Sequence, residues 1–394
     1  MRVKVHRGLN QIGGSVIEIA SETTKILLDA GLELNGELDD QFELEGLFDH
    51  KGYDAVFLSH YHSDHIGLAY RIHKDIPLYM GEMSFKVIEA SDRYKGIETL
   101  VIEGFIHHKR PINIGNMVIT PFLCDHSAFD SYMILVECEG EKILYTGDFR
   151  ANGRKPFAWL LEQLPTKIDI LICEGTSLSR INDRNETEQE LEERAVDLFT
   201  QTKGPIFVLQ SSMNIDRLVT IYRAAKRSER IMLQDLYLAE ISSSIGGSIP
   251  NPKSFADVQV FLTRPYSEEH YRYAMFQTYG AKRISKEKLS KTKFVMCIRA
   301  SMKEYINSLS NKMTLTGGLL IYSFWSGYQE QEDMNTFLTR CEALGLRTIS
   351  MHTSGHADQE TIRELIEHTK PGRIIPVHTE NAAWFDEFDS LPHC

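Results

Sequence analysis

Residues 60–65 read His-Tyr-His-Ser-Asp-His and constrain the fold of this chain more than any other stretch. Three imidazoles and a carboxylate directly follow the apolar run Ala55–Leu58, which predicts a short buried strand, and Gly67 then lets the chain turn. Imidazole and carboxylate are ligands of zinc and similar divalent ions. A polar loop with a chance run of histidines is the alternative, but its probability is on the order of 10⁻³. The run therefore predicts a metal-binding strand end.

The composition is that of a folded protein, with 42 % apolar and 25 % charged residues in 394 positions. This length predicts two or three domain-sized units. The formal net charge of −12 argues against a broad basic surface of the kind that coats a nucleic-acid duplex. It leaves nucleic acid open as a substrate, because a metal centre and a few local cations can hold phosphates.

Three negative features of the sequence predict a cytoplasmic protein with no membrane contact. The six cysteines include no CxxC pair, which favours a reduced compartment over a disulfide framework. No stretch approaches the roughly 18 apolar residues of a membrane span. The chain opens with a strand pattern rather than a signal peptide.

The pattern of apolar and polar residues along the sequence changes near residue 185. Before it, short apolar runs alternate with glycine-bearing turns, which predicts a sheet-on-sheet core with helices outside. These strands are expected at Val16–Ile19, Lys25–Leu28, Ala55–Leu58, Met117–Thr120, Tyr132–Glu137, Lys142–Tyr145 and Ile168–Cys173. After it, a helix over Glu186–Thr200 and the strand Ile206–Leu209 begin a βαβ rhythm that predicts a parallel sheet. A charged connector, Lys282–Lys293, precedes two further buried strands, Phe294–Ile298 and Leu319–Tyr322.

Further potential ligands stand where predicted strands end, namely Asp29, His126, Asp148 and His378. Polar groups at strand ends near glycines are where an α/β scaffold places its site. Taken singly, each is more simply a capping residue, a turn residue or a core histidine. Beside the cluster at 60–65, the ligand interpretation is favoured for all four.

The order Asp29, His60-x-His62-x-Asp64-His65, His126, Asp148 resembles the first four motifs of the metallo-β-lactamase superfamily. Glu174 in LICEGT, His356 in HTSGHA and His378 in PVHTE resemble motifs A, B and C of its nucleic-acid-processing β-CASP branch. Within that branch the SGHA and PVH turns are most similar to those of the ribonuclease J family. The motifs span almost the whole chain.

This resemblance implies an α/β protein, a metallo-β-lactamase αββα sandwich with an inserted α/β β-CASP domain whose parallel sheet is flanked by helices. The sandwich would comprise residues 1–185 and 349–394, and the inserted domain residues 186–348. The segment 236–279 has no counterpart that we identify in the family, and its role is left open. The C-terminal domain that supports oligomerisation in ribonuclease J has no counterpart after His378, and a homodimer stays an alternative to the monomer.

The resemblance also implies a centre of two divalent metal ions, zinc first, with manganese or magnesium as alternatives. One ion would be held by His60, His62 and His126, the other by Asp64, His65 and His378, with Asp148 as the bridge. Two such ions can deprotonate a bridging water and neutralise a phosphodiester under in-line attack.

Other residues receive roles from the same resemblance. Asp29 would orient a ligand or the nucleophile, with a plain strand-end turn as the alternative. His356 would stabilise the phosphate or the leaving group, charged and fixed by Glu174. The predicted substrate contacts are Ser211, Ser212, His352, Ser354, Gly355 and His356. Ser211 and Ser212 are equally well read as helix caps, and His352 as a packing residue. Arg150, Arg154 and Lys155 are further candidates for phosphate contacts.

The leading hypothesis is a metal-dependent nuclease that cleaves single-stranded RNA, or single-stranded DNA, and leaves a 5′-phosphate. Exonucleolytic entry at the 5′ end and internal cleavage both stay open. A second hypothesis is a small-molecule hydrolase of the same fold that acts on an ester, thioester or lactam. Glu174, His356 and the inserted domain argue against it, because a small substrate needs no second domain. A third hypothesis, a catalytically silent RNA-processing scaffold, ranks last because no ligand is lost.

Overall fold

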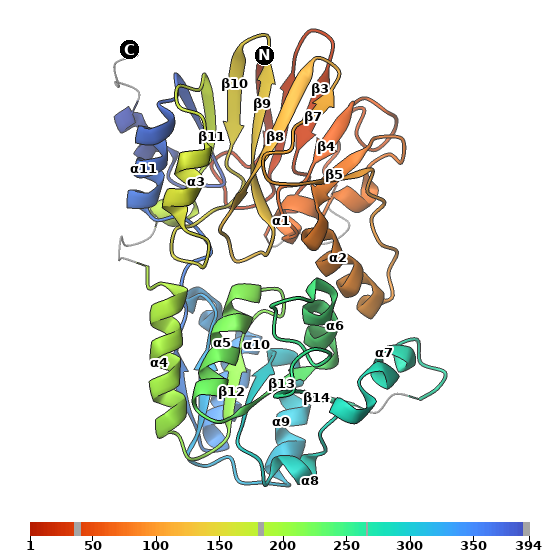
Figure 1. Ribbon diagram of the computed structural model, residues 1–394, viewed down its shortest axis with the longest axis vertical. Helices are drawn as coiled ribbons and strands as arrows, with labels where there is room; N and C mark the ends of the chain where they lie inside the picture. Colours follow the sequence, from red (N-terminus) through yellow and green to blue (C-terminus); the bar gives the residue numbers. More distant parts are fainter. Residues whose placement is uncertain (35–40, 180–184, 265–266, 389–394) are drawn as a thin grey trace. The chain divides into compact units, whose positions relative to one another are not determined.

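The computed structural model describes residues 1–34, 41–179, 185–264 and 267–388 (Figure 1). Their contacts divide the chain into two compact units. The first unit comprises residues 1–88, 99–185 and the chain from 355 onward, and the second comprises residues 89–98 and 186–354. The first unit is therefore assembled from both ends of the chain.

The first unit contains two six-stranded sheets. One sheet has the order β1 (Arg2–Arg7), β2 (Val16–Ala20), β3 (Lys25–Leu28), β4 (Ala55–Phe57), β5 (Leu78–Gly81), β6 (Gly104–Ile106). The other has the order β18 (Arg373–Val377), β11 (Ile170–Glu174), β10 (Glu141–Tyr145), β9 (Ser131–Cys138), β8 (Met117–Cys124), β7 (Ile112–Ile114). Strand β18 pairs in parallel with β11, so the C-terminal part of the chain completes the second sheet.

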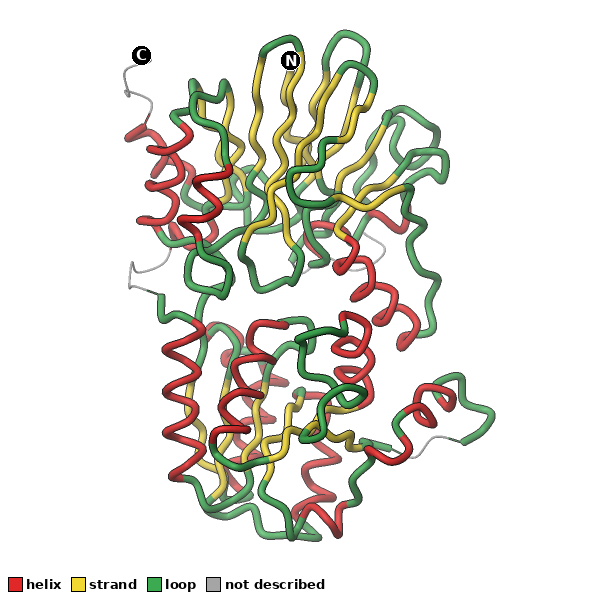
Figure 2. The backbone as a smooth tube through the Cα atoms, viewed as in Figure 1, coloured by secondary structure: helices red, strands yellow, loops and turns green. Residues whose placement is uncertain are grey.

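Alternating side chains explain how these strands form layers. In β9, Ile134 and Val136 lie in the core between the two sheets, whereas Met133 and Leu135 lie in the core between the second sheet and its helices. Both faces of the strand are thus buried, which is why it reads as a continuous apolar run. Figure 2 shows the two layers of strands in this unit.

Helices complete the first unit on the outside of the sheets. The outer core of the second sheet is formed with side chains from α3 (Phe157–Gln163), α11 (Gln359–Thr369) and the 3₁₀ segment η6 (Ala382–Phe388). The remaining helical elements with residues in this unit are α1 (Ser63–Ile66), η1 (Ala69–Arg71), the start of α2 (Glu82–Lys95) and η2 (Thr176–Ser179). The predicted αββα layering is confirmed.

The second unit is built on one parallel sheet. Its order is β14 (Val258–Phe261), β13 (Ile231–Asp235), β15 (Phe294–Ile298), β12 (Ile206–Leu209), β16 (Gly318–Tyr322), β17 (Leu346–Ser350), and every pairing between these strands is parallel. Helices α4 (Glu188–Gln201) and α5 (Ile215–Arg227) pack against each other. Helices α9 (Lys303–Ser310) and α10 (Glu332–Ala343) share a buried core with the sheet.

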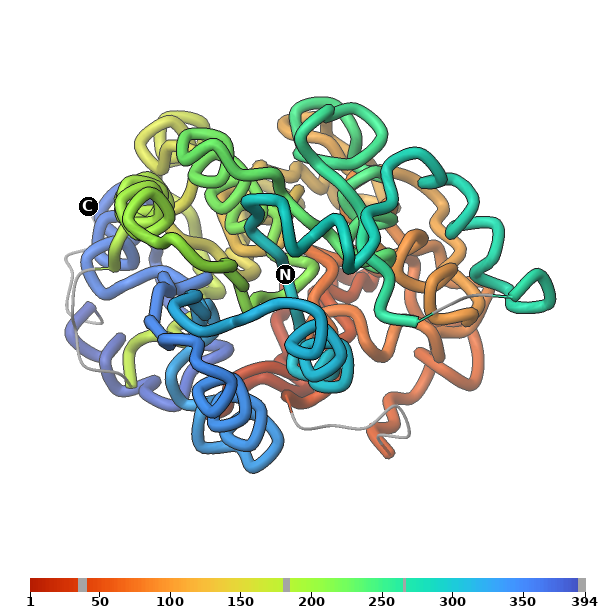
Figure 3. The backbone as a smooth tube through the Cα atoms, turned by 90° about the horizontal axis from the view of Figure 1, so that it is seen from below, coloured from red at the N-terminus to blue at the C-terminus, as the bar shows by residue number. Residues whose placement is uncertain are grey.

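The segment 236–279 forms one edge of this unit. It contains α6 (Leu236–Ile245), the edge strand β14 and α7 (Tyr273–Thr278), and α7 extends away from the sheet (Figures 1 and 3). The expected connector at 282–293 contains the short helix α8 (Lys286–Leu289), preceded by η3 (Gly280–Lys282). The two remaining 3₁₀ segments are η4 (Ala300–Met302) and η5 (Ser326–Glu330).

Candidate metal centre

The candidate ligands stand just beyond the carboxyl ends of strands of both sheets in the first unit. Asp29 follows β3, and the run at 60–65 follows β4 and leads into α1. In the second sheet, His126 follows β8, Asp148 follows β10 and His378 follows β18. Because these strand ends gather at one edge of the sandwich, residues more than 300 positions apart become neighbours.

Three imidazoles form the first ligand group. The ring nitrogen Nδ1 of His62 lies 3.2 Å from His60 Nε2 and 3.1 Å from His126 Nε2. His60 and His126 are buried, and the three residues offer ring nitrogen atoms within 4.8 Å of one another. A tris-imidazole group of this kind is a known zinc ligand set.

The second ligand group combines carboxylates and imidazoles. His378 Nε2 lies 3.0 Å from Asp64 Oδ2, and His65 Nε2 lies 3.8 Å from the same oxygen. Together with Asp148, these residues offer ligand atoms within 4.8 Å of one another. All of them are buried.

Asp148 lies between the two groups. Its Oδ2 atom is 3.8 Å from both His60 Nε2 and His126 Nε2, and 3.2 Å from His65 Nε2. Among the residues that the structure describes, its Oδ1 atom has no hydrogen-bond partner although it is fully buried. A buried carboxylate oxygen without a donor is costly unless a cation balances it. This residue therefore fits a metal-bridging position.

The outer nitrogen atoms of the ligand imidazoles are held by hydrogen bonds. His60 Nδ1 contacts Ser59 Oγ at 3.0 Å, and His65 Nδ1 contacts Asp29 Oδ2 at 2.7 Å. His126 Nδ1 contacts the carbonyl oxygen of Gly355 at 2.5 Å. His378 Nδ1 contacts Thr176 Oγ1 at 2.7 Å. Each contact orients a ring so that the opposite nitrogen faces the centre, as in known metal sites.

Asp29 makes several hydrogen bonds in this outer layer. Its fully buried carboxylate accepts hydrogen bonds from Ser59 N and Oγ at 2.7 and 2.8 Å, and from Tyr145 Oη at 2.7 Å. Its backbone has a left-handed φ of 58°, and that of His378 has 51°. Such φ values are unfavourable outside glycine and tend to occur at functional sites. Asp29 thus orients His65 by a contact to the ring nitrogen that faces away from the candidate metal centre.

The electrostatic environment favours neutral imidazoles in the first ligand group. Burial and neighbouring imidazoles lower the pKa of His60 well below its usual value, burial also lowers that of His126, and burial lowers that of His62 to about 4. These rings are therefore neutral, as ligands must be. Burial alone would lower the pKa of His65, but Asp148, Asp64 and Asp29 raise it. Burial opposes ionisation of Asp148, yet the surrounding histidines lower its pKa.

Glu174 and His356 form a pair beside Asp148. His356 Nδ1 lies 3.2 Å from Glu174 Oε2 and 3.6 Å from Asp148 Oδ2. The Glu174 carboxylate is buried and accepts hydrogen bonds from the backbone N–H groups of Phe149 and Thr176. The His356 side chain keeps 21 % of its surface exposed. The pair thus joins a fixed anion to an imidazole that solvent can reach.

The remaining residues that were predicted to contact the substrate are divided between the two units. Gly355 belongs to the first unit, where a Cβ atom would lie 2.9 Å from Ser127 Oγ, so a glycine allows its carbonyl to approach His126. His352 and Ser354 follow β17 and belong to the second unit.

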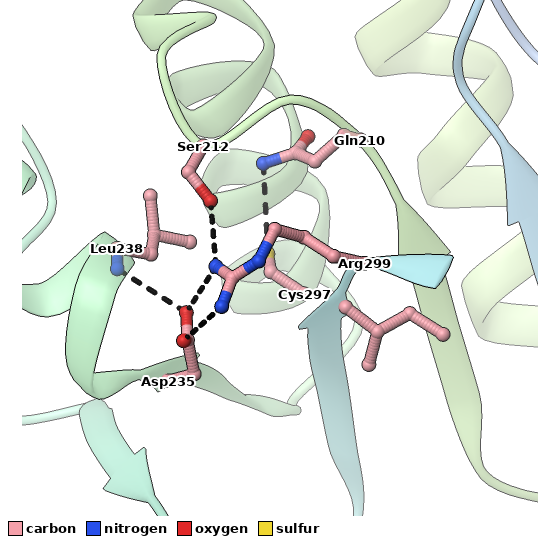
Figure 4. A pocket seen from close by; sticks show the side chains of 7 residues that line it. Gln210, Ser212, Asp235, Leu238, Cys297 and Arg299 are labelled. Atoms are coloured by element: carbon pink, nitrogen blue, oxygen red, sulfur yellow. Dashed lines mark hydrogen bonds and ion pairs between the residues drawn. The ribbon is translucent and has the colours of Figure 1, made fainter. Parts of the chain in front are cut away.

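Ser211 and Ser212 lie in the turn between β12 and α5 in the second unit. Ser211 is exposed, and its Oγ accepts a hydrogen bond from Met213 N. Ser212 is buried and accepts a hydrogen bond from Arg299 Nη1 at 3.0 Å. Figure 4 shows the guanidinium of Arg299 between Ser212 and the carboxylate of Asp235, which it meets at 2.6 and 3.0 Å.

Sequence reasoning was wrong about Arg150 and missed several supporting residues. Arg150 is 1 % exposed and bonded to Asp125, so it cannot meet a phosphate in solvent. Ser59, Tyr145 and Thr176 were not predicted to support the ligands. Only Ser59 carried a signal in the sequence, as the neighbour of His60.

Comparisons with known proteins match two family domains and one solved structure. Residues 24–209 match the β-lactamase superfamily domain, and residues 344–386 match the Zn-dependent metallo-hydrolase RNA specificity domain. A solved structure of a protein of unknown function from Enterococcus faecalis has the same fold, with a TM-score of 0.79 and 22 % identity. That similarity covers 97 % of this chain and 94 % of the other.

Two curated relatives align with nearly the whole chain. Ribonuclease J from Helicobacter pylori is 23 % identical over 95 % of this chain and 55 % of its own length. Probable RNase MJ4 from Methanocaldococcus jannaschii is 24 % identical over 94 % of this chain and 91 % of its own length. The chain thus spans about half of the Helicobacter protein.

The family matches and the relatives support a metallo-β-lactamase superfamily protein of the β-CASP branch that is similar to ribonuclease J. Its histidine and aspartate cluster is capable of binding metal ions. None of the described helices combines the length and the apolar character needed to cross a lipid bilayer.

Proposed function

We propose that this protein is a metal-dependent ribonuclease that hydrolyses phosphodiester bonds of single-stranded RNA and leaves a 5′-phosphate. The observation that carries the proposal is the position of Asp148, whose Oδ2 atom lies within 3.8 Å of both His126 and His65. One carboxylate thereby serves two adjacent ligand groups. The relatives named as ribonucleases and the RNA specificity domain support RNA as the substrate.

The ligand assignment follows from the two groups. His60, His62 and His126 would hold one ion, Asp64, His65 and His378 the other, and Asp148 would bridge them. Zinc fits this donor set best, and manganese is an alternative. Ions bound there would supply a nucleophile at neutral pH and stabilise the charge of a phosphodiester under in-line attack.

His356 is the proposed group that meets the substrate. Glu174 faces its Nδ1 atom and favours the protonated ring, so Nε2 would donate to a phosphate oxygen or to the leaving oxygen. Asp29 acts differently, because it contacts His65 and Ser59 behind the ligands and only positions them.

The test is a cleavage assay with single-stranded RNA and single-stranded DNA, each labelled at the 5′ or the 3′ end, with Mn²⁺, Zn²⁺ or a chelator. Asp148→Asn should lower the cleavage rate at least about 100-fold, because it removes the shared anionic ligand. Glu162→Gln, on the exposed face of α3, is the matched control and should cleave like the wild type.

The outcomes separate the hypotheses. Equal activity of the wild type and Asp148→Asn would contradict the bridging role of this carboxylate. Hydrolysis of a thioester or a lactam without cleavage of nucleic acid would favour the small-molecule hydrolase. The position of the label in the first products distinguishes entry at the 5′ end from internal cleavage.

A further inference from the structure

The loop that carries His126 is held to two other ligand-bearing segments. On one side, Tyr61, which stands between His60 and His62, accepts a hydrogen bond from Phe129 N at 2.8 Å. On the other side, Asp125 contacts the segment that follows Asp148. Three ligand segments from different strands are thereby joined directly to one another.

Asp125 makes the more extensive of these connections. Its Oδ1 atom accepts a hydrogen bond from Arg150 Nε at 2.6 Å, and its Oδ2 atom accepts from the backbone N–H groups of Arg154 and Lys155 at 2.7 and 2.6 Å. Its carbonyl oxygen accepts from Arg150 N at 2.8 Å. Residues 150–155 therefore wrap around one carboxylate.

The shape of this loop depends on Gly153. A Cβ atom at that position would lie 1.9 Å from Asp125 Oδ1, well inside van der Waals contact. Only glycine lets the backbone pass this close to the carboxylate. The loop and the carboxylate thus fit each other as a specific pair.

Burial makes the ion pair a rigid connection. The side chains of Asp125 and Arg150 are 1 % and 0 % exposed, so water cannot replace either partner. Loss of one partner would leave the other charge buried without this counterion. The pair joins the residue immediately before His126 to the second residue after Asp148. His126 belongs to the first proposed metal group, and Asp148 is shared by both groups.

We propose that Asp125 is a positioning residue of the metal centre, which fixes the separation of His126 and Asp148 through Arg150 and residues 150–155. This inference rests on the proposed metal centre. Some residues contact a metal ligand without touching the metal itself. Removing such a contact typically lowers metal affinity or activity by about 10- to 100-fold. Asp125 would therefore control metal binding without touching an ion.

Asp130 provides a matched control on the same loop. It is a buried carboxylate that accepts hydrogen bonds from Met83 N and Ser84 N at the start of α2, and from Tyr132 Oη. These hydrogen bonds do not involve the segment that follows Asp148, although the charge of Lys155 in that segment acts on Asp130. Asp130→Asn should therefore lower stability but keep the separation of the two ligands.

The experiment compares the wild type, Asp125→Asn and Asp130→Asn after metal removal. Co²⁺ is titrated into each protein and followed by visible absorption, and urea unfolding of the metal-free proteins measures stability. We expect both variants to lose stability. Only Asp125→Asn should bind Co²⁺ at least about 10-fold more weakly and with an altered spectrum.

A double variant separates positioning from folding. Arg150→Met in the Asp125→Asn background removes the buried charge that has lost the Asp125 carboxylate and should restore stability, while Co²⁺ binding stays weak. Wild-type Co²⁺ affinity and spectrum in either Asp125→Asn protein would overturn the positioning role. RNA cleavage by the wild type is measured in parallel, and its absence would refute the proposed substrate while the Co²⁺ comparison still decides the role of Asp125.

Discussion

At the residue scale, the histidines of the centre determine how pH acts on the metal-free protein. Burial lowers the pKa of His60, His62 and His126, and the value for His62 is about 4. In the unfolded chain the pKa of a histidine is near 6.5. Below pH 6.5 the unfolded state therefore binds protons that the folded state does not bind. The free energy of unfolding consequently decreases as the pH is lowered.

Two other groups contribute outside this pH window. The raised pKa of His65 gives stability that is complete below pH 6.5 and is lost as pH rises through the folded-state pKa. The lowered pKa of Asp148 gives stability that is lost only in acid, below the usual range of a carboxylate. Between pH 6.5 and 5, the three neutral imidazoles contribute most of the slope, and His108, whose pKa is also lowered by burial, adds to it.

We predict that the free energy of unfolding of the chelator-treated protein decreases between pH 6.5 and 5. Each histidine that stays neutral contributes up to about 2 kcal/mol over this range. Urea titrations at pH 6.5, 5.75 and 5 measure the slope, and His126→Asn should make it shallower. A free energy that does not change with pH would contradict neutral imidazoles in this group.

At the scale of elements, a buried ion pair joins the first two helices of the second unit. Glu188, the first residue of α4, meets Arg217 of α5 at 3.1 and 3.2 Å, and neither side chain is exposed. Thr220 donates a further hydrogen bond to the same carboxylate at 2.6 Å. Thr187 begins α4 with a capping box that also involves Glu190.

We predict that Glu188→Ala lowers the free energy of unfolding by about 3–5 kcal/mol, because it leaves the Arg217 charge buried without this partner. Arg223→Ala removes a contact between the same two helices, 3.5 Å from Glu192, but the Arg223 side chain is 53 % exposed. Its loss should cost less than about 1 kcal/mol. Urea unfolding compares the two variants, and equal losses would disprove the difference between buried and exposed pairs.

Element prediction from the sequence succeeded where a helical period or a continuous apolar run was clear. The helix expected at 186–200 is observed at Glu188–Gln201, and the strand expected at 16–19 is observed at Val16–Ala20. The short strands β5, β6, β7 and β14 were missed, because three or four residues carry too little periodicity unless they form a continuous apolar run, as in β4 and β12. The candidate ligands could be recognised from the sequence because they follow strands within recognisable motifs. Asp125 and Arg150 could not, since their pairing depends on how two distant loops fold.

At the scale of the whole molecule, strand β18 completes both a sheet and the candidate site. It pairs with β11 from Ile170 to Glu174 and brings His378 to Asp64. Helix α11, which precedes it, contributes Ile362, Leu365 and Ile366 to the core that covers the second sheet. The first unit therefore depends on residues near the C-terminus.

We predict that a chain ending at residue 372 loses Co²⁺ binding and the cooperative unfolding of the first unit. It would lack His378 and expose the edge of β11. The second unit has its own buried core and should keep a cooperative transition, which circular dichroism during urea unfolding would detect. Retention of wild-type Co²⁺ affinity by this shortened chain would contradict the predicted contribution of β18.

The separation of 314 residues between Asp64 and His378 also has a consequence during protein synthesis. At typical translation rates, the ribosome adds His378 about 15 to 60 s after Asp64. Throughout that interval the nascent chain lacks His378, one of the candidate metal ligands. If the protein cleaves RNA as proposed, the order of its strands keeps each copy from cutting the messenger RNA that is still encoding it.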